Sequence, residues 1–462
     1  MNTLIEHGWL VCVNATQDIY RDSYVWIEDG RIIDLGPMAQ MPAGLREQAD
    51  QILDATGQAV MPGMVNAHTH LFQTFLRGVR DDLPLETWLD RVIWRNAALL
   101  TEEDFYLAAS LGCVENLKSG ATFVVENHYV QTSKRNCDHV FEGMQRTGIK
   151  GCLARGGMDR DDRVRASLPD FDVSPFLESH EVAFAELERL RQSWHGRDDK
   201  YYLAVAPITT WLCSPEFCHG LADYAREHEL CIHIHTAETR PTQEWVQADH
   251  RMREAFYIDK MGLLGPRTQL VHSVWLDESE LELVAARQAN LVHCPVSNMY
   301  LASGVAPIIK ALLLGLNVAL GTDGPASNNA QDNLETLKAT ACLHKVHHLN
   351  AAVLSPMQIL EMACMGGARA MHLDEQIGSL EVGKCADLVL VNLQRAHIAP
   401  VHRAESALVF NCNGNDVETV LVNGEIVVKQ GQCVHVDEAK LVAQAQARIE
   451  ELRATICQNA GV

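Results

Sequence analysis

The 462-residue sequence has no long uninterrupted apolar run, no basic leader followed by an apolar core, and no C-x-x-C pair. Without about 18 consecutive apolar residues, no helix is expected to span a membrane. The opening MNTLIEHGWLVCVN does not have the pattern of a secretory signal peptide. The 14 cysteines lie mostly in apolar segments. We therefore expect reduced thiols in the core of a cytoplasmic protein and no disulfide framework.

Positive charge is also scarce. The chain has 38 lysines and arginines against 60 aspartates and glutamates, which gives a formal net charge of −22. Such a surface repels phosphate groups, so we expect no nucleic-acid partner and no binding to anionic membranes. The remaining partner class is a small molecule.

Short apolar runs alternate with longer amphipathic stretches through the middle of the chain. Continuous apolar strands separated by helical segments indicate a parallel sheet that is buried on both faces. Because there are eight such runs, the sequence predicts an α/β fold with a closed (β/α)₈ barrel. The runs cover residues 60–68, 121–129, 150–157, 202–209, 230–238, 269–275, 289–296 and 317–324.

The two ends of the chain differ from the middle. They contain short β-rich segments joined by Asp-Gly and Asn-Gly, as in VWIEDGRIIDLG and TVLVNGEIVVKQG, and these dipeptides are hairpin signals. We predict a small β-sandwich domain built from both termini. The predicted domains are residues 1–59 and 376–435 for the β-sandwich, 60–375 for the barrel and 436–462 for a C-terminal helix.

Polar residues end several of the apolar runs, where a barrel places its active site. His68 and His70 end the first run and, being two residues apart on a strand, share one face. His235 and Glu238 end the fifth, and Asp323 ends the eighth. Three imidazoles and one carboxylate suit Zn²⁺ or Fe²⁺. Glu238 could then serve as a base without being a ligand.

Each of these residues also has a structural interpretation. An H-x-H pair, a turn aspartate in GTDG or His272 in the sixth run could each be structural. We interpret His233 as a core histidine and the histidines of HKVHHLN (344–350) as a solvated helix face. We favour the metal site because one site explains all the polar residues at the strand ends. The structural interpretation needs a separate role for each of them.

The combination PGMVNAHTH, HTAET, LVHS, VHCPVSNMYLASG and GTDGPASNN, followed by IGSLEVGKCADLVLVNL, resembles the amidohydrolase superfamily over nearly the whole chain. Its mononuclear aminohydrolases include S-adenosylhomocysteine/5-methylthioadenosine deaminases, 8-oxoguanine deaminase and atrazine chlorohydrolase. The resemblance implies one divalent metal, zinc first and iron second, with dimers or larger homo-oligomers. It also implies these roles: His68, His70, His235 and Asp323 as ligands, and Glu238, His272 and Asp323 as catalytic groups.

The implied reaction is hydrolytic deamination of an N-heterocycle such as a purine, pyrimidine, pterin or s-triazine. Metal-bound hydroxide would attack a ring carbon, and Glu238 would carry the proton to the ring and to departing ammonia. The alternatives are a chlorohydrolase or amide hydrolase of a triazine-like ring and, less favoured, an S-adenosylhomocysteine/5-methylthioadenosine deaminase. An inactive scaffold is disfavoured because the ligand set is intact.

Four residues are predicted to contact the substrate. Glu86 and Trp88 match the Glu-x-Trp of adenosine-derivative deaminases, in which the carboxylate and the indole would face a nucleoside. Gln73 and Ser327 are the other two. The segment VAPITTWLCSPE departs from that pattern, because Ile208 occupies the place where those deaminases have a histidine. Gly324, which follows the metal aspartate, instead fits the deaminase form.

Overall fold

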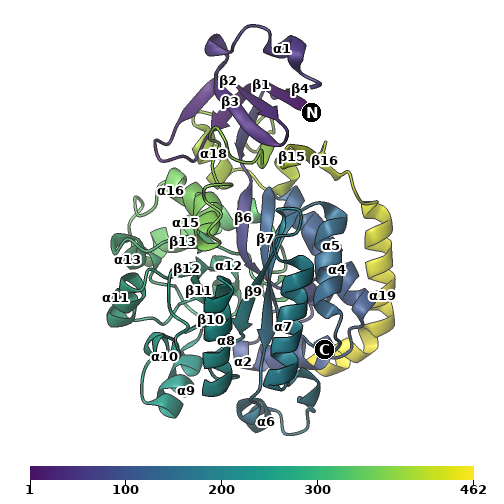
Figure 1. Cartoon of the computed structure of the whole chain (residues 1–462), viewed down its shortest axis with the longest axis vertical. Helices are drawn as coiled ribbons and strands as arrows, with labels where there is room; N and C mark the ends of the chain where they lie inside the picture. The colour runs from purple at the N-terminus through teal and green to yellow at the C-terminus, as the bar shows by residue number, and fades with distance from the viewer.

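The computed structural model describes residues 1–462, apart from the side chain of Ser167. Within that part, eight parallel strands form a sheet in which each strand pairs with the next along the chain. The amide of Asp323 donates to His68 O at 3.0 Å and so links the last strand to the first. The result is the nearly closed barrel that the sequence predicts (Figure 1). Its strands are β6 (Met64–Thr69), β7 (Ala121–His128), β8 (Lys150–Gly157), β9 (Tyr201–Pro207), β10 (Cys231–Thr236), β11 (Thr268–His272), β12 (Asn290–His293) and β13 (Val318–Leu320).

Helices follow the strands and cover the outside of the barrel (Figure 1). The segment CHGLADYAREHEL lies largely in α8 (Pro215–Glu227), and ESELELVAARQA lies largely in α11 (Glu278–Ala286). The Ser214 hydroxyl accepts from the Phe217 amide, so it satisfies an otherwise unpaired donor at the start of α8. The other main helices are α4 (Glu102–Lys118), α5 (Asn136–Thr147), α7 (His180–Trp194), α9 (Arg240–His250), α10 (Glu254–Lys260), α13 (Ile308–Leu313), α15 (Asn333–His347) and α16 (Pro356–Glu361).

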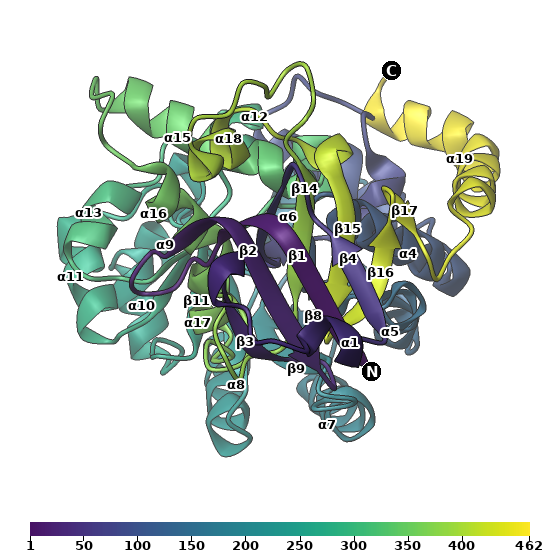
Figure 2. The same cartoon turned by 90° about the horizontal axis from the view of Figure 1, so that it is seen from above.

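A second, mixed sheet is built from both ends of the chain. Its order is β17-β16-β15-β14-β5-β1-β2-β3, and β4 also pairs with β1. The N-terminal and C-terminal parts meet where β5 and β14 pair antiparallel, and Figure 2 shows them side by side above the barrel. The strands are β1 (Asn2–Val11), β2 (Ile19–Glu28), β3 (Arg31–Pro37), β4 (Gln51–Asp54), β5 (Gln58–Pro62), β14 (Leu388–Asn392), β15 (Val417–Val422), β16 (Glu425–Lys429) and β17 (Gln432–Cys433).

The two hairpin signals of the sequence form tight turns in this sheet. Asp29 and Gly30 join β2 to β3 with φ of 45° and 80°, and Asn423 and Gly424 join β15 to β16 with φ of 49° and 73°. Two consecutive residues with positive φ are the mark of a type I′ turn, which matches the right-handed twist of the paired strands. The predicted hairpins are therefore confirmed.

The apolar run of residues 60–68 is shared between the two sheets. Its first part belongs to β5, and its second part enters the barrel as β6. Gly63 lies between them, and a Cβ atom there would be 2.1 Å from Thr122 Oγ1. The glycine therefore allows the chain to pass closely against the neighbouring strand as it changes sheets.

A long final helix, α19 (Glu438–Ala460), runs from the small sheet to the far end of the barrel (Figure 1). Arg448 bonds Asp104 of α4 at 2.8 and 3.0 Å, and the Arg80 guanidinium donates to Ala460 O at 3.0 Å. The helix therefore reaches the segment after β6 that carries pocket residues. Among the described helices, none combines the length and the apolarity that a membrane span needs.

Candidate active site

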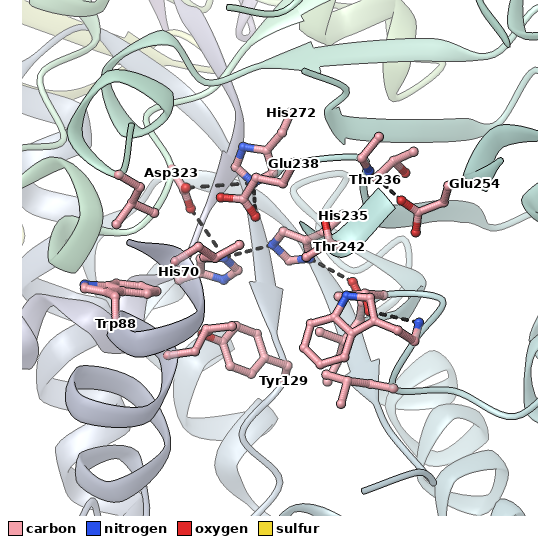
Figure 3. A pocket seen from close by; sticks show the side chains of 18 of the residues that line it. His70, Trp88, Tyr129, His235, Thr236, Glu238, Thr242, Glu254, His272 and Asp323 are labelled. Carbon is pink, nitrogen blue, oxygen red and sulfur yellow. Dashed lines mark hydrogen bonds and ion pairs between the residues drawn. The ribbon is translucent and has the colours of Figure 1, made fainter. Parts of the chain in front are cut away.

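The four side chains predicted as metal ligands converge at the carboxyl ends of the barrel strands. Figure 3 shows three of them, His70, His235 and Asp323. His68 lies in β6 and His70 directly follows it, while His235 lies in β10 and Asp323 follows β13. Asp323 Oδ1 is 3.3 Å from His68 Nε2 and 3.4 Å from His70 Nε2. The Nε2 atoms of His70 and His235 are 3.3 Å apart. Three separate strands thus direct their polar ends at one point.

These separations fit a small divalent cation. Ligand atoms about 2.0–2.1 Å from a tetrahedral zinc ion lie about 3.3 Å from one another, as they do here. His68 Nε2 is buried and has no hydrogen-bond partner, which is costly for a polar atom unless a ligand uses it. Nitrogen and carboxylate donors together suit zinc or ferrous iron. The residues therefore fit the divalent metal that the sequence predicts.

Burial keeps the three imidazoles neutral, as ligands must be. Removal from water lowers the pKa of His70 to about 3 and also lowers the pKa of His68 and His235. Burial alone would raise the pKa of Asp323, but the adjacent imidazole of His68 and the other nearby imidazoles hold it well below its usual range. The set thus offers three lone pairs and one negative charge.

Backbone carbonyls set the orientation of two of the rings. His70 Nδ1 lies 2.7 Å from Asn127 O, and His235 Nδ1 lies 2.8 Å from Ile208 O. A carbonyl only accepts, so Nδ1 carries the proton in each ring and Nε2 keeps its lone pair. Both Nε2 atoms therefore face the metal position with the electrons needed for coordination.

Two hydrogen-bonded side chains fix the tautomer of His68 in a similar way. The Gln269 amide nitrogen donates to Ala370 O at 2.8 Å, which leaves its oxygen to accept from His233 Nδ1 at 2.5 Å. His233 Nε2 must then accept the proton of His68 Nδ1, 2.8 Å away. This order leaves the lone pair of His68 on Nε2. The interpretation of His233 as merely a core histidine was incomplete, because its ring bonds His68, one of the predicted ligands.

We expect His233→Leu to weaken metal binding by about 10- to 100-fold, as is typical when a group that orients a ligand is lost. The leucine fills much of the space but cannot fix the ring of His68. Metal content after dialysis against graded chelator measures the effect. His347→Leu, the same change at an exposed histidine of α15, is the matched control. Unchanged retention of metal in His233→Leu would refute the role.

Glu238 and His272 lie beside the ligands (Figure 3). His272 Nε2 is 3.6 Å from Glu238 Oε2 and 3.9 Å from Asp323 Oδ2. His272 Nδ1 is 3.1 Å from Asn298 Oδ1, which can accept its proton. Burial, with the nearby charge of Asp323, raises the pKa of Glu238 well above its usual value. A buried carboxyl with a raised pKa can exchange protons near neutral pH.

Asp323 is held from two further sides. The Ser297 hydroxyl donates to Oδ2 at 2.6 Å, and the Gly324 amide donates to Oδ1 at 2.7 Å. Asp323 has φ of 62° and His272 has φ of 67°, so both lie in the left-handed region that side chains with a Cβ rarely adopt. Such backbone strain is typical of residues whose side chains must be aimed at a site.

One pocket has His70, His235, Glu238, His272 and Asp323 at its floor. Its walls are mostly aromatic and aliphatic, so a flat ring can pack against them. Among the described residues, neither lysine nor arginine lines it. The lining includes Gln73, Leu85, Trp88, Leu89, Trp94, Tyr129, Ile208, Thr209, Trp211, Leu212, Thr242, Glu254 and Leu301.

Two of the four predicted substrate contacts line the pocket, and the other two lie outside its lining. Gln73 and Trp88 line the pocket, and the Trp88 indole donates to Ala326 O at 3.2 Å. Glu86 lines a neighbouring hollow and accepts from the Thr239 hydroxyl at 2.9 Å. Ser327 is buried and donates to Gly324 O at 3.2 Å, outside the pocket lining.

Other pocket residues were not singled out from the sequence. Tyr129 directly follows β7, and Trp211 follows β9 within four residues, so position after a strand was the available signal. Trp94 had none. The histidines of HKVHHLN also differ from expectation: His347 and His348 are exposed, but His344 is buried, with Nε2 3.1 Å from His293 Nε2. The solvated-face interpretation was wrong for His344, because its turn of α15 faces the barrel.

Comparisons with known proteins agree with this geometry. The sequence model of the amidohydrolase family matches residues 59–427. A 5-methylthioadenosine/S-adenosylhomocysteine deaminase of Pelotomaculum thermopropionicum is 34% identical over 97% of this chain and 98% of its own. A 5′-deoxyadenosine deaminase of Methanothermobacter thermautotrophicus is 36% identical over 94% and 95%. The crystal structure of a zinc-bound adenosine deaminase from Xanthomonas campestris superposes with a TM-score of 0.89, at 31% identity over 98% of both chains.

Proposed function

Because the chain belongs to the amidohydrolase family, we propose that it hydrolytically removes an exocyclic amino group from an adenine-type ring and releases ammonia. The observation that carries the proposal is the convergence of three neutral imidazoles and Asp323 beside the protonatable Glu238, at the floor of an apolar pocket. This arrangement supplies both parts that hydrolysis needs, a cation site and an acid–base group.

We assign the cation as zinc. His68, His70, His235 and Asp323 would hold it, and their spacing suits a tetrahedral ion. When bound, the cation supplies Lewis acidity, which lowers the pKa of water to about 7. Ferrous iron has the same ligand preferences and is the alternative.

Glu238 is the proton carrier in this proposal. It takes a proton from the attacking water and gives it to the ring nitrogen next to the reacting carbon, which makes that carbon more electrophilic. His272 Nε2 lies within 4 Å of both Glu238 and Asp323, so it can orient the attacking water between the two carboxylates. Glu238 then takes the proton of the new hydroxyl on that carbon and gives it to the amino group, which leaves as ammonia when the C–N bond breaks and the C=O bond forms.

The pocket walls support a flat, uncharged ring as the substrate. Trp88, Trp94 and Trp211 line the pocket, and aromatic side chains pack well against a flat ring. Two relatives of 34% and 36% identity are named for adenosine derivatives, which favours an adenine-type ring as the first class to test. Ile208 lines the pocket in place of a polar side chain, so recognition of the ring at that wall relies on shape.

A screen of adenine nucleosides, other purines, pyrimidines, pterins and triazines for ammonia release tests the proposal. We expect adenine nucleosides to give the highest kcat/KM and to turn into the corresponding 6-oxo compounds. A chlorinated triazine serves as the control for the competing chlorohydrolase. Release of chloride with no ammonia from any ring would contradict the deaminase assignment.

A further inference from the structure

Glu254 is a second buried carboxylate in the pocket, and no step of the proposed reaction uses it. It is the first residue of α10, is 1% exposed, and lies in the same pocket as Glu238 (Figure 3). We propose that Glu254 is a positioning residue that holds the backbone turn presenting Glu238 to the metal centre. The inference rests on the proposed function, in which Glu238 carries the proton.

The two oxygens of Glu254 join the ends of neighbouring barrel strands. Oε2 accepts from the Ala237 amide at 2.6 Å, and Oε1 accepts from the Thr210 hydroxyl at 2.5 Å. Ala237 directly follows β10 and precedes Glu238, while Thr210 lies just after β9. The Glu254 side chain thus bridges the residues that follow two adjacent strands. The turn is therefore tied at its central amide.

The turn needs such a tie because its backbone is strained. Ala237 has φ of 45°, in the left-handed region that is unfavourable for a residue with a Cβ. The Trp275 amide donates to Ala237 O at 2.9 Å and the Ser273 amide to Thr236 O at 3.0 Å, so the carbonyls are fixed by the next loop. Among the described residues, Glu254 alone accepts from the Ala237 amide. Relaxation of φ would rotate the peptide that leads into Glu238.

Glu254 is itself well anchored. Its amide donates to Gln243 Oε1 at 3.3 Å, and the Ala255 amide donates at 3.0 Å to Glu280, which is fully buried. Arg253 Nε bonds the other oxygen of Glu280 at 2.8 Å. These bonds fix the start of α10, so the carboxylate has a rigid base from which to hold the turn.

Two conservative substitutions separate the effect of side-chain length from the effect of negative charge at position 254. Glu254→Gln keeps the length and an oxygen for the Ala237 amide, and its NH₂ can donate to the Thr210 hydroxyl. Glu254→Asp keeps the charge but is one methylene too short to span both partners. We expect Gln to stay within a few-fold of wild-type kcat and Asp to fall about 10²-fold, the cost of a misplacement of about 1 Å. KM and metal content should change little in either variant.

In a protein that already carries Glu238→Gln, adding Glu254→Asp should not lower kcat further, because Glu254 acts through Glu238. Hydrogen exchange of the Ala237 amide adds a readout that needs no turnover: it should be faster in Glu254→Asp and unchanged in Glu254→Gln. Glu244→Asp, on the exposed face of α9, is the control for the same chemical change.

A lower kcat in Glu254→Gln than in Glu254→Asp would overturn the proposal in favour of a role of charge. So would loss of metal in both variants, which would indicate general structural damage. If Glu254→Asp does not fold, Glu254→Gln still decides, because a role of charge requires it to lose turnover. If the wild type releases no ammonia from any ring, the proposed function fails, while the exchange measurement still tests the hold on Ala237.

Discussion

Glu238→Gln should keep its metal and lose turnover by a factor of about 10²–10⁴, the range expected when a general acid–base group is removed. The amide has the size of the carboxyl and keeps a hydrogen-bonding oxygen, but it cannot carry the proton from water to the ring. Glu238 Oε2 is 3.6 Å from His272 Nε2, beside the ligand set and not within it. Metal analysis together with kcat measures both halves of the expectation.

The matched comparison is Glu216→Gln, an exposed carboxylate in the first turn of α8, which should alter neither metal nor rate. If Glu238→Gln lost its metal as readily as a ligand variant, Glu238 would be a ligand and the proposed proton path would be wrong. If it kept both metal and rate, the proton carrier would lie elsewhere, with Asp323 next to examine.

His235→Ala should bind no metal tightly and show no measurable turnover. In the proposed site His235 supplies one of three imidazole lone pairs, and its Nε2 is 3.3 Å from that of His70. Its loss would leave the cation with two imidazoles and one carboxylate. Elemental analysis of the purified wild type should find about one zinc or iron per chain, and the variant close to none. Chelation of the wild type should abolish activity reversibly, with zinc restoring it.

His347→Ala provides the control, since His347 is an exposed histidine of α15 away from the ligands. Two tightly bound ions in the wild type would contradict a mononuclear site. Active wild-type protein that contains no metal would contradict the metal-dependent reaction itself.

The sequence allows the barrel and the ligand set to be predicted because both depend on local patterns. The period of the apolar runs identifies parallel strands, and the carboxyl ends of such strands meet at one end of a barrel, so His68, His235 and Asp323 had to approach one another. The Asp-Gly and Asn-Gly turns are likewise local, since only a few residue types adopt positive φ at two successive positions.

The remaining parts of the site depend on contacts between distant segments. His233 supports His68 only because Gln269, on the neighbouring β11, has its amide oriented by Ala370, far along the chain. Trp94 reaches the pocket as the last residue of the short helical segment Leu89–Trp94. Glu254 resembles any acidic residue at a helix start until the fold brings it to Ala237. Tertiary packing, and not residue pattern, decides such contacts.

The course of α19 bears on how the protein can be tagged or immobilised. Its last residues bond Arg80 and Asn96, at either end of the segment that contributes Leu85 and Trp88 to the pocket. A peptide tag joined after Val462 would therefore start beside this segment. The first residue lies at the small sheet, at the opposite end of the molecule (Figure 1). Attachment to a solid support through the N-terminus should leave the segment free, whereas attachment through the C-terminus should restrain it.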